Sequence, residues 1–146
     1  CFKMRSFLCA AVGLAAISLG THAMANENNP LQGDRWNHRP LVVVVPTPED
    51  PVLKALNDEL NAPASREAFV EREMVLYRVV EGRATRNDKP LTPDQAAALL
   101  EALDAKPDGP ATVYLIGKDG GVKVKREGGV DAQDIFATID RMPMRQ

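Results

Sequence analysis

Apolar residues are grouped into a few short runs, which polar, proline-rich or glycine-rich segments separate. Residues 41–45 (LVVVV) are apolar at every position, which is typical of a strand buried on both faces of a sheet. Residues 74–80 (MVLYRVV) and 112–116 (TVYLI) indicate two further buried strands. Residues 122–126 (VKVKR) alternate in polarity, which favours an edge strand whose lysines protect the exposed edge. The pattern therefore predicts four strands.

Segments with helical periodicity lie between these strands and after the last of them. Asp50 is an acidic N-cap followed by proline, and the apolar face that begins there is interrupted at Pro63. A short second piece is predicted over residues 65–71. Residues 92–95 (TPDQ) form a capping box ahead of a clear apolar stripe, and Asp131 caps a last helix.

The predicted order is β-α-β-α-β-β-α. Two strands joined by a helix are parallel with a right-handed crossover, and residues 117–121 (GKDGG) predict a tight hairpin turn between the last two strands. We therefore expect the α/β class and a thioredoxin-like, or peroxiredoxin-like, four-stranded mixed sheet with helices on both faces. Residues 81–90 (EGRATRNDKP) are expected to be a polar loop, with Arg83, Arg86 and Lys89 solvated.

The first 25 residues have the pattern of a secretory signal. Lys3 and Arg5 give a short positive region, residues 7–19 are apolar, and residues 21–25 (THAMA) end in the small residues that signal peptidase needs. The apolar run is shorter than the roughly 20 residues of a membrane-spanning helix. We expect cleavage at the end of this segment, no membrane span afterwards, and a periplasmic or secreted protein.

A lipid anchor at Cys9 is the alternative to simple cleavage. It is disfavoured because the cysteine lies early in the apolar run, which continues beyond it. The expected organisation is a signal peptide over residues 1–25, an N-terminal tail and lead-in segment over residues 26–40, and a thioredoxin-like domain over residues 41–146.

Removal of the leader changes the charge and the available chemistry. The whole chain has 18 basic and 20 acidic side chains, and loss of Lys3 and Arg5 leaves 16 basic against 20 acidic, a formal charge of −4. This balance predicts no nucleic-acid partner. Both cysteines, Cys1 and Cys9, lie in the leader, and His38 is the one histidine that remains. About 120 residues suffice to form a core without disulfides.

Three segments of the mature chain resemble one family. They are residues 35–41 (RWNHRPL), 71–76 (EREMVL) and 115–123 (LIGKDGGVK). In this order and spacing they look like the bacterial members of the DUDES-type family, a secreted thioredoxin-like domain of unknown function. Related domains occur in animal sushi-repeat and coiled-coil matrix proteins. The resemblance covers nearly the whole mature chain and implies a thioredoxin-like or peroxiredoxin-like fold, without implying a known reaction.

The position of the expected redox site lacks sulfur. A thioredoxin-like redox enzyme needs a cysteine where the first strand leads into a helix, and that segment here is residues 46–49 (PTPE). The mature chain therefore excludes thiol–disulfide and thiol peroxidase chemistry. Thr47 as a nucleophile would need a base, but His38 lies at the far end of a strand that spans about 16 Å. We interpret Thr47 as a turn residue and His38 as a surface residue.

No metal site and no cofactor are expected, because one histidine without cysteine and carboxylates without calcium-loop spacing do not form a ligand set. Four other residues are candidates for structural or anion-binding roles: Arg35, Trp36, Arg39 and Arg72. A guanidinium suits anions, but for Arg72 we favour an ion pair with an acidic neighbour. The candidate partners are Asp34, Glu71 and Glu73. For Trp36 we favour packing as a lid over an exposed recognition role.

Two functional interpretations follow. The favoured one is an exported, non-redox binding or accessory protein of the cell envelope, a monomer or weak dimer. Its protein partner or ligand would contact a corner formed by Thr47, Glu49 and Pro110. The alternative is an enzyme with cysteine-independent chemistry at the same corner, using Thr47, Glu49 and an arginine. A buried Glu49 with a raised pKa would favour the enzyme, and an exposed aromatic patch around Trp36 would favour the binding protein.

Overall fold

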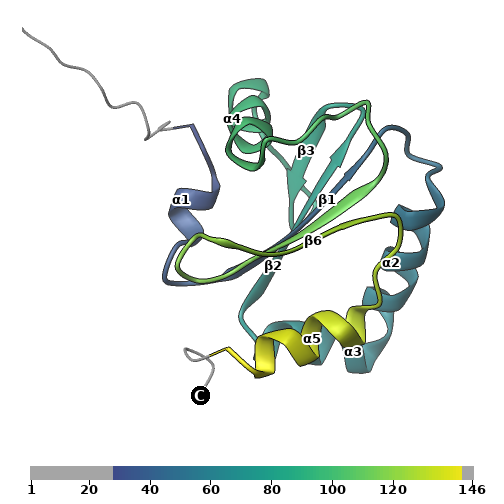
Figure 1. The fold of residues 1–146 in the computed structure, drawn as a ribbon, viewed down its shortest axis with the longest axis vertical. Helices are drawn as coiled ribbons and strands as arrows, with labels where there is room; N and C mark the ends of the chain where they lie inside the picture. The colour runs from purple at the N-terminus through teal and green to yellow at the C-terminus, as the bar shows by residue number, and fades with distance from the viewer. Residues whose placement is uncertain (1–27, 143–146) are drawn as a thin grey trace, which may run out of the picture.

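The computed structural model describes residues 28–142, so the predicted leader lies outside the described residues (Figure 1). None of the described helices is long and apolar enough to cross a membrane. The elements, in chain order, are α1 (Leu31–Asp34), β1 (Arg39–Val45), α2 (Pro51–Asn61), α3 (Pro63–Glu71), β2 (Met74–Val80), β3 (Arg83–Arg86), β4 (Lys89–Pro90), α4 (Pro93–Leu103), β5 (Thr112–Ile116), β6 (Val122–Glu127) and α5 (Ala132–Asp140).

The strands form a single mixed sheet in the order β4-β3-β2-β1-β5-β6. β1 pairs in parallel with β2 and antiparallel with β5, and the remaining neighbours are antiparallel. The predicted α/β class and mixed sheet are confirmed, and all four predicted strands are present. β6 lies at the edge of the sheet, as its alternating lysines predicted.

The predicted number of four strands is wrong, because residues 81–90 form β3 and β4 instead of a loop. Glu81 and Gly82 both have positive φ, 54° and 79°, which is the geometry of a tight hairpin turn. The chain therefore turns directly back along β2. Ala84 is the one buried residue of β3. A single buried position gives no alternation of apolar and polar residues, so the sequence pattern does not indicate a strand.

Alternate side chains of β1 enter two separate cores. Leu41, Val43 and Val45 pack with apolar residues of α2 and α5, whereas Val42 and Val44 pack with α4 and with Leu31 of α1. Figure 1 shows α4 on one side of the sheet and α2, α3 and α5 on the other. All residues of β1 are buried, which explains why residues 41–45 are apolar at every position.

Three of the predicted helix starts are confirmed by their hydrogen bonds. Asp50 and Asp131 each accept a hydrogen bond from the backbone N–H two residues later, at 2.9 and 2.8 Å. The capping box at α4 is complete, because Thr92 Oγ1 accepts from the Gln95 N–H at 3.1 Å and Gln95 Oε1 accepts from the Thr92 N–H at 2.9 Å. The break at Pro63 separates α2 from α3. The predicted start of α3 at residue 65 is wrong, because the helix begins at Pro63, and proline suits the first helical position.

Candidate functional site

The two predicted sets of site residues lie at opposite ends of β1. Thr47 and Glu49 follow the strand, whereas Arg35 and Trp36 precede it. Val44 pairs with Thr112, so Pro110 lies at the same end of the sheet as Thr47. All three corner residues are exposed, and Pro110 lines a hollow of about 420 Å³ that neither Thr47 nor Glu49 lines. The corner therefore stays a prediction.

Trp36 lies at the tip of the turn between α1 and β1. Its side chain is 57% exposed, so the prediction that it packs as a lid is wrong. The physical reason is its backbone: φ is 71°, and the Trp36 N–H donates to the Lys118 carbonyl oxygen at 2.6 Å. A bulky residue in this left-handed region is a true outlier, and such strain persists only where the surroundings impose it.

Arg35 lies against the exposed indole. Its guanidinium carbon is 5.3 Å from the centre of the Trp36 ring, within the range of a cation–π contact. Its stem also passes the β5–β6 turn, where a Cβ on Gly120 would lie 3.6 Å from Arg35 Cδ. Gly120 has a φ of 87°, which favours glycine. The turn thus presents an aromatic ring and a cation side by side.

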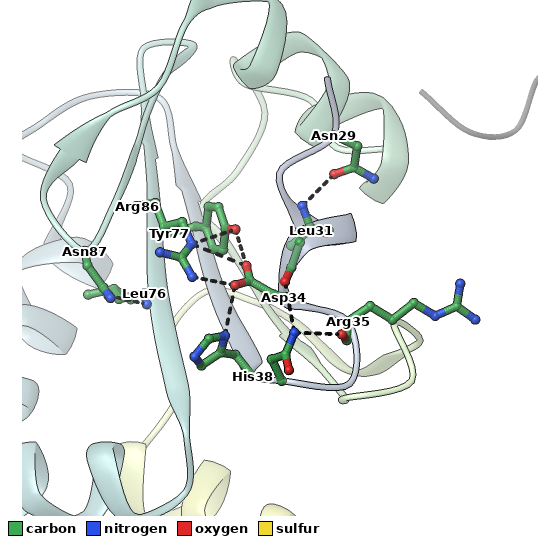
Figure 2. A network of polar contacts seen from close by, with 11 residues as sticks. Asn29, Leu31, Asp34, Arg35, His38, Leu76, Tyr77, Arg86 and Asn87 are labelled. Atoms are coloured by element: carbon green, nitrogen blue, oxygen red, sulfur yellow. Dashed lines mark hydrogen bonds and ion pairs between the residues drawn. The ribbon is translucent and has the colours of Figure 1, made fainter. Parts of the chain in front are cut away.

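A buried carboxylate fixes this turn to the sheet (Figure 2). Asp34, at the end of α1, has 2% exposure and accepts hydrogen bonds from the Tyr77 hydroxyl of β2 and the Arg86 guanidinium of β3. His38 Nδ1 lies 3.3 Å from Asp34 Oδ1. The Asp34 backbone carbonyl accepts from the N–H groups of Asn37 and His38 at 2.9 and 2.8 Å. We call Asp34, His38, Tyr77 and Arg86 the polar anchor.

Both main donors of the polar anchor keep their protons. Burial raises the pKa of Tyr77 above its usual value, and the hydrogen bond to Asp34 raises it further. The hydrogen bond to Asp34 likewise raises the pKa of Arg86. A carboxylate removed from water needs such partners, because burial of an unpaired charge is very costly. The Asp34 carboxylate is therefore paired with Tyr77 and Arg86, whereas His38 Nδ1 lies near it without a hydrogen bond. The anchor is a structural network that holds the chain on both sides of Trp36.

A second ion pair holds the other side of the turn. Lys118 Nζ lies 2.8 Å from Glu73 Oε1, and this hydrogen bond and the positive charge of Lys118 lower the pKa of Glu73. The backbone carbonyl of the same lysine accepts the Trp36 N–H. The β5–β6 turn, the start of β2 and the Trp36 turn are thus joined.

The remaining arginines have structural contacts. Arg39 has 1% exposure, and its Nη1 donates to the Arg72 carbonyl oxygen at 2.9 Å. Arg72 forms an ion pair, as the structural interpretation expected, but with Asp140 of α5, at 2.8 and 3.0 Å. Its guanidinium carbon also lies 5.0 Å from the centre of the Phe136 ring.

Sequence reasoning missed the contacts of the polar anchor. Arg86 was expected to be solvated, but it pairs with Asp34, which lies 52 residues earlier in the chain. The apolar pattern places Tyr77 in a buried strand but indicates no partner for its hydroxyl. A tyrosine in place of an aliphatic residue within a buried strand is the available signal, because a buried hydroxyl needs a partner.

The geometry defines a mixed α/β domain with an exposed tryptophan whose backbone is held by neighbouring turns. A family model described as "Domain of unknown function (DUF4174)" matches residues 30–146, and the chain belongs to this family. The match agrees with the predicted resemblance to a family of unknown function. A comparison with curated proteins finds no match. Within residues 28–142, no group of three or more His, Cys, Asp or Glu side chains has a metal-binding arrangement.

The strain at Trp36 predicts a difference between two substitutions that both remove the ring. Trp36→Gly is expected to be more stable than Trp36→Ala by about 1 kcal/mol, because glycine adopts positive φ without a Cβ penalty. Chemical denaturation of both variants measures this difference. Equal stabilities, or a more stable alanine variant, would show that the left-handed backbone is not imposed on the turn.

Proposed function

We propose that the protein is a binding module that contacts a protein partner through a surface formed by Arg35, Trp36 and Gly120, named here the Trp36 surface. The observation that carries this proposal is an exposed indole on a left-handed backbone that the buried Asp34, paired with the half-buried Arg86, holds in place. Tryptophan and arginine are enriched among the residues that dominate binding energy. Backbone strain of about 1–3 kcal/mol is concentrated at functional sites.

The shape beside the indole supports this proposal. A hollow of about 360 Å³ lies between α1 and the β5–β6 turn, and Arg35, Asp119 and Gly120 contribute to its walls. A side chain of the partner can enter this hollow while the Trp36 ring contacts the partner beside it. A residue whose backbone is already held in place loses less conformational entropy on binding, which favours affinity.

The enzymatic alternative receives less support at its corner. Glu49 is exposed, so it is not the buried carboxylate on which that alternative depends. Thr47 is exposed as well. The acid, phenol and guanidinium of the polar anchor are hydrogen-bonded to one another. The arrangement thus favours binding over catalysis.

Fold and location form the second part of the proposal. The strand order β2-β1-β5-β6, with β1 and β2 parallel, supports a thioredoxin-like core to which β3 and β4 are added at one edge. The charged and apolar segments of residues 1–25 support export to the periplasm or the exterior. The absence of cysteine from residues 26–146 supports a non-redox role in that compartment. In this proposal the protein is a monomer or weak dimer.

The test is partner capture from an envelope extract with the full chain carrying a C-terminal tag. Trp36→Ala is expected to weaken capture of the partner at least tenfold, because hot-spot truncation typically costs about 2 kcal/mol or more. Thermal denaturation first confirms that the variant is folded.

The control carries Thr47→Ala and Glu49→Gln, at the opposite end of β1. It is expected to capture the same partner as the unmodified protein. A partner that is lost in the control and kept by Trp36→Ala would move the binding site to the predicted corner and overturn the role of the Trp36 surface.

A further inference from the structure

A further hollow, of about 270 Å³, lies apart from the Trp36 surface, on the face of the sheet covered by α2 and α3. It is formed where the break at Pro63 separates the two helices, beside β2 and the turn between β3 and β4. Its volume is close to the lower end of ligand pockets, about 300 Å³. We name it the α2–α3 hollow.

Apolar side chains line one part of the hollow. Leu60 and Leu76 belong to the core and are buried, and Phe69 is partly buried against it. Val70 is 75% exposed, more than any other large apolar side chain among residues 28–142. An apolar ligand here would cover Val70 and Phe69 and remove their surface from water, which is favourable.

Hydrogen-bond donors dominate the rim. Arg66 is exposed, and among the described residues its side chain has no ion-pair partner. Arg78 donates Nε to Asn57 Oδ1 at 2.9 Å and Nη1 to Asp88. Asn87 Oδ1 accepts the Leu76 N–H at 2.9 Å, which leaves the amide Nδ2 of Asn87 as a donor.

The charges of the rim do not balance. Two guanidinium groups face one carboxylate, and the carboxylate of Asp88 is already paired with Arg78. The uncompensated charge is that of Arg66. A guanidinium beside an apolar wall is complementary to a carboxylate attached to an apolar body, and its planar donors bind a carboxylate in a bidentate manner.

We propose that the α2–α3 hollow binds an apolar monocarboxylic acid of medium size, with its carboxylate on Arg66 and its hydrocarbon part against Phe69, Val70 and Leu76. The asparagine amide of Asn87 is a second donor for the same group. The size of the hollow limits the ligand to roughly ten non-hydrogen atoms, since larger ligands occupy pockets well above about 300 Å³. This site is independent of the Trp36 surface and of the proposed protein partner.

Octanoate is the probe for this proposal. The protein is expressed from the full-length sequence and used in the form that remains after any cleavage of the leader. Titration by isothermal calorimetry is expected to give a Kd of roughly 0.1–1 mM, as for a small ligand with one charged contact. Amide chemical shifts are expected to change in α3 and in the β3–β4 turn. Octanol, which lacks the carboxylate, is expected to bind at least tenfold more weakly.

Arg66→Gln is the decisive variant, because it keeps an exposed polar side chain and removes the charge. It is expected to weaken octanoate binding at least tenfold and to leave octanol binding unchanged. Arg126→Gln, an exposed arginine of β6 that does not line the hollow, is the matched control and is expected to bind octanoate normally. Val70→Ser is expected to weaken both probes.

Three outcomes would overturn the proposal. The first is the absence of shift changes at the hollow at 10 mM octanoate, about ten times the weakest expected Kd. The second is equal octanoate affinity for Arg66→Gln and the unmodified protein. The third is binding in the hollow of a peptide with an apolar C-terminal residue but not of octanoate, which would make a peptide terminus the occupant instead of a free acid.

Discussion

Asp34→Ala is expected to lower the free energy of unfolding by about 3 kcal/mol, the lower end for breaking a buried ion pair, because Asp34 is buried whereas the Arg86 side chain is 34% exposed. The substitution leaves the Arg86 guanidinium without its carboxylate and the buried Tyr77 hydroxyl without its acceptor. It also removes the group that fixes the end of α1 to the sheet. Urea denaturation followed by far-UV circular dichroism measures the change.

The control for Asp34→Ala is Asp58→Ala, at an exposed aspartate of α2, which is expected to change stability by less than about 0.5 kcal/mol. The sequence contains one tryptophan, so fluorescence anisotropy reports on the anchored turn alone. Faster local motion of Trp36 is expected in Asp34→Ala but not in Asp58→Ala. An unchanged anisotropy decay would mean that the polar anchor does not hold the turn.

Leu99→Ala is the second substitution with a large expected effect, again about 3 kcal/mol. Leu99 has 0% exposure in the core between α4 and the sheet, so its truncation leaves a cavity surrounded by apolar residues of β1, β2 and β5. The loss of stability is the sum of the transfer free energy of the removed carbons and the cost of the cavity that they leave. Thermal and chemical denaturation measure it.

Leu100→Ala is the matched control on the same helix, since the residue type and the helix propensity change identically. Leu100 is only partly buried against the same core, and we expect a loss of about 1 kcal/mol. Equal losses at the two positions would contradict the assignment of the buried stripe of α4. A larger loss at Leu100 would mean that α4 is rotated about its axis.

The strands and helices that bury a continuous apolar pattern could be predicted from the sequence. The apolar run at residues 41–45 predicted the central strand. Asp50 and Thr92, each followed by proline, predicted the first residue of their helices correctly. Local interactions determine these features. β3 could not be predicted, because Ala84 is its one buried residue and a single inward position gives no alternation.

The candidate site depended on interactions that local patterns do not contain. Arg72 and Asp140 are 68 residues apart in the sequence. Tyr77 and Arg86, the partners of Asp34, are 43 and 52 residues away from it. The exposure of Trp36 follows from a positive φ that the surrounding contacts impose on a residue type that rarely adopts it. For such a residue, burial inferred from hydrophobicity gives the wrong answer.

The position of β1 has a consequence for the order of folding. β2, β3 and β4 form a local antiparallel unit, and β5 and β6 form a local hairpin, so each can pair through short loops. β1 is the strand that joins the two units, and both of its partners lie far along the chain. Closing those long loops is entropically costly and slow. Completion of the sheet therefore requires the docking of seven residues, Arg39–Val45, between two units whose own strands are joined by short loops.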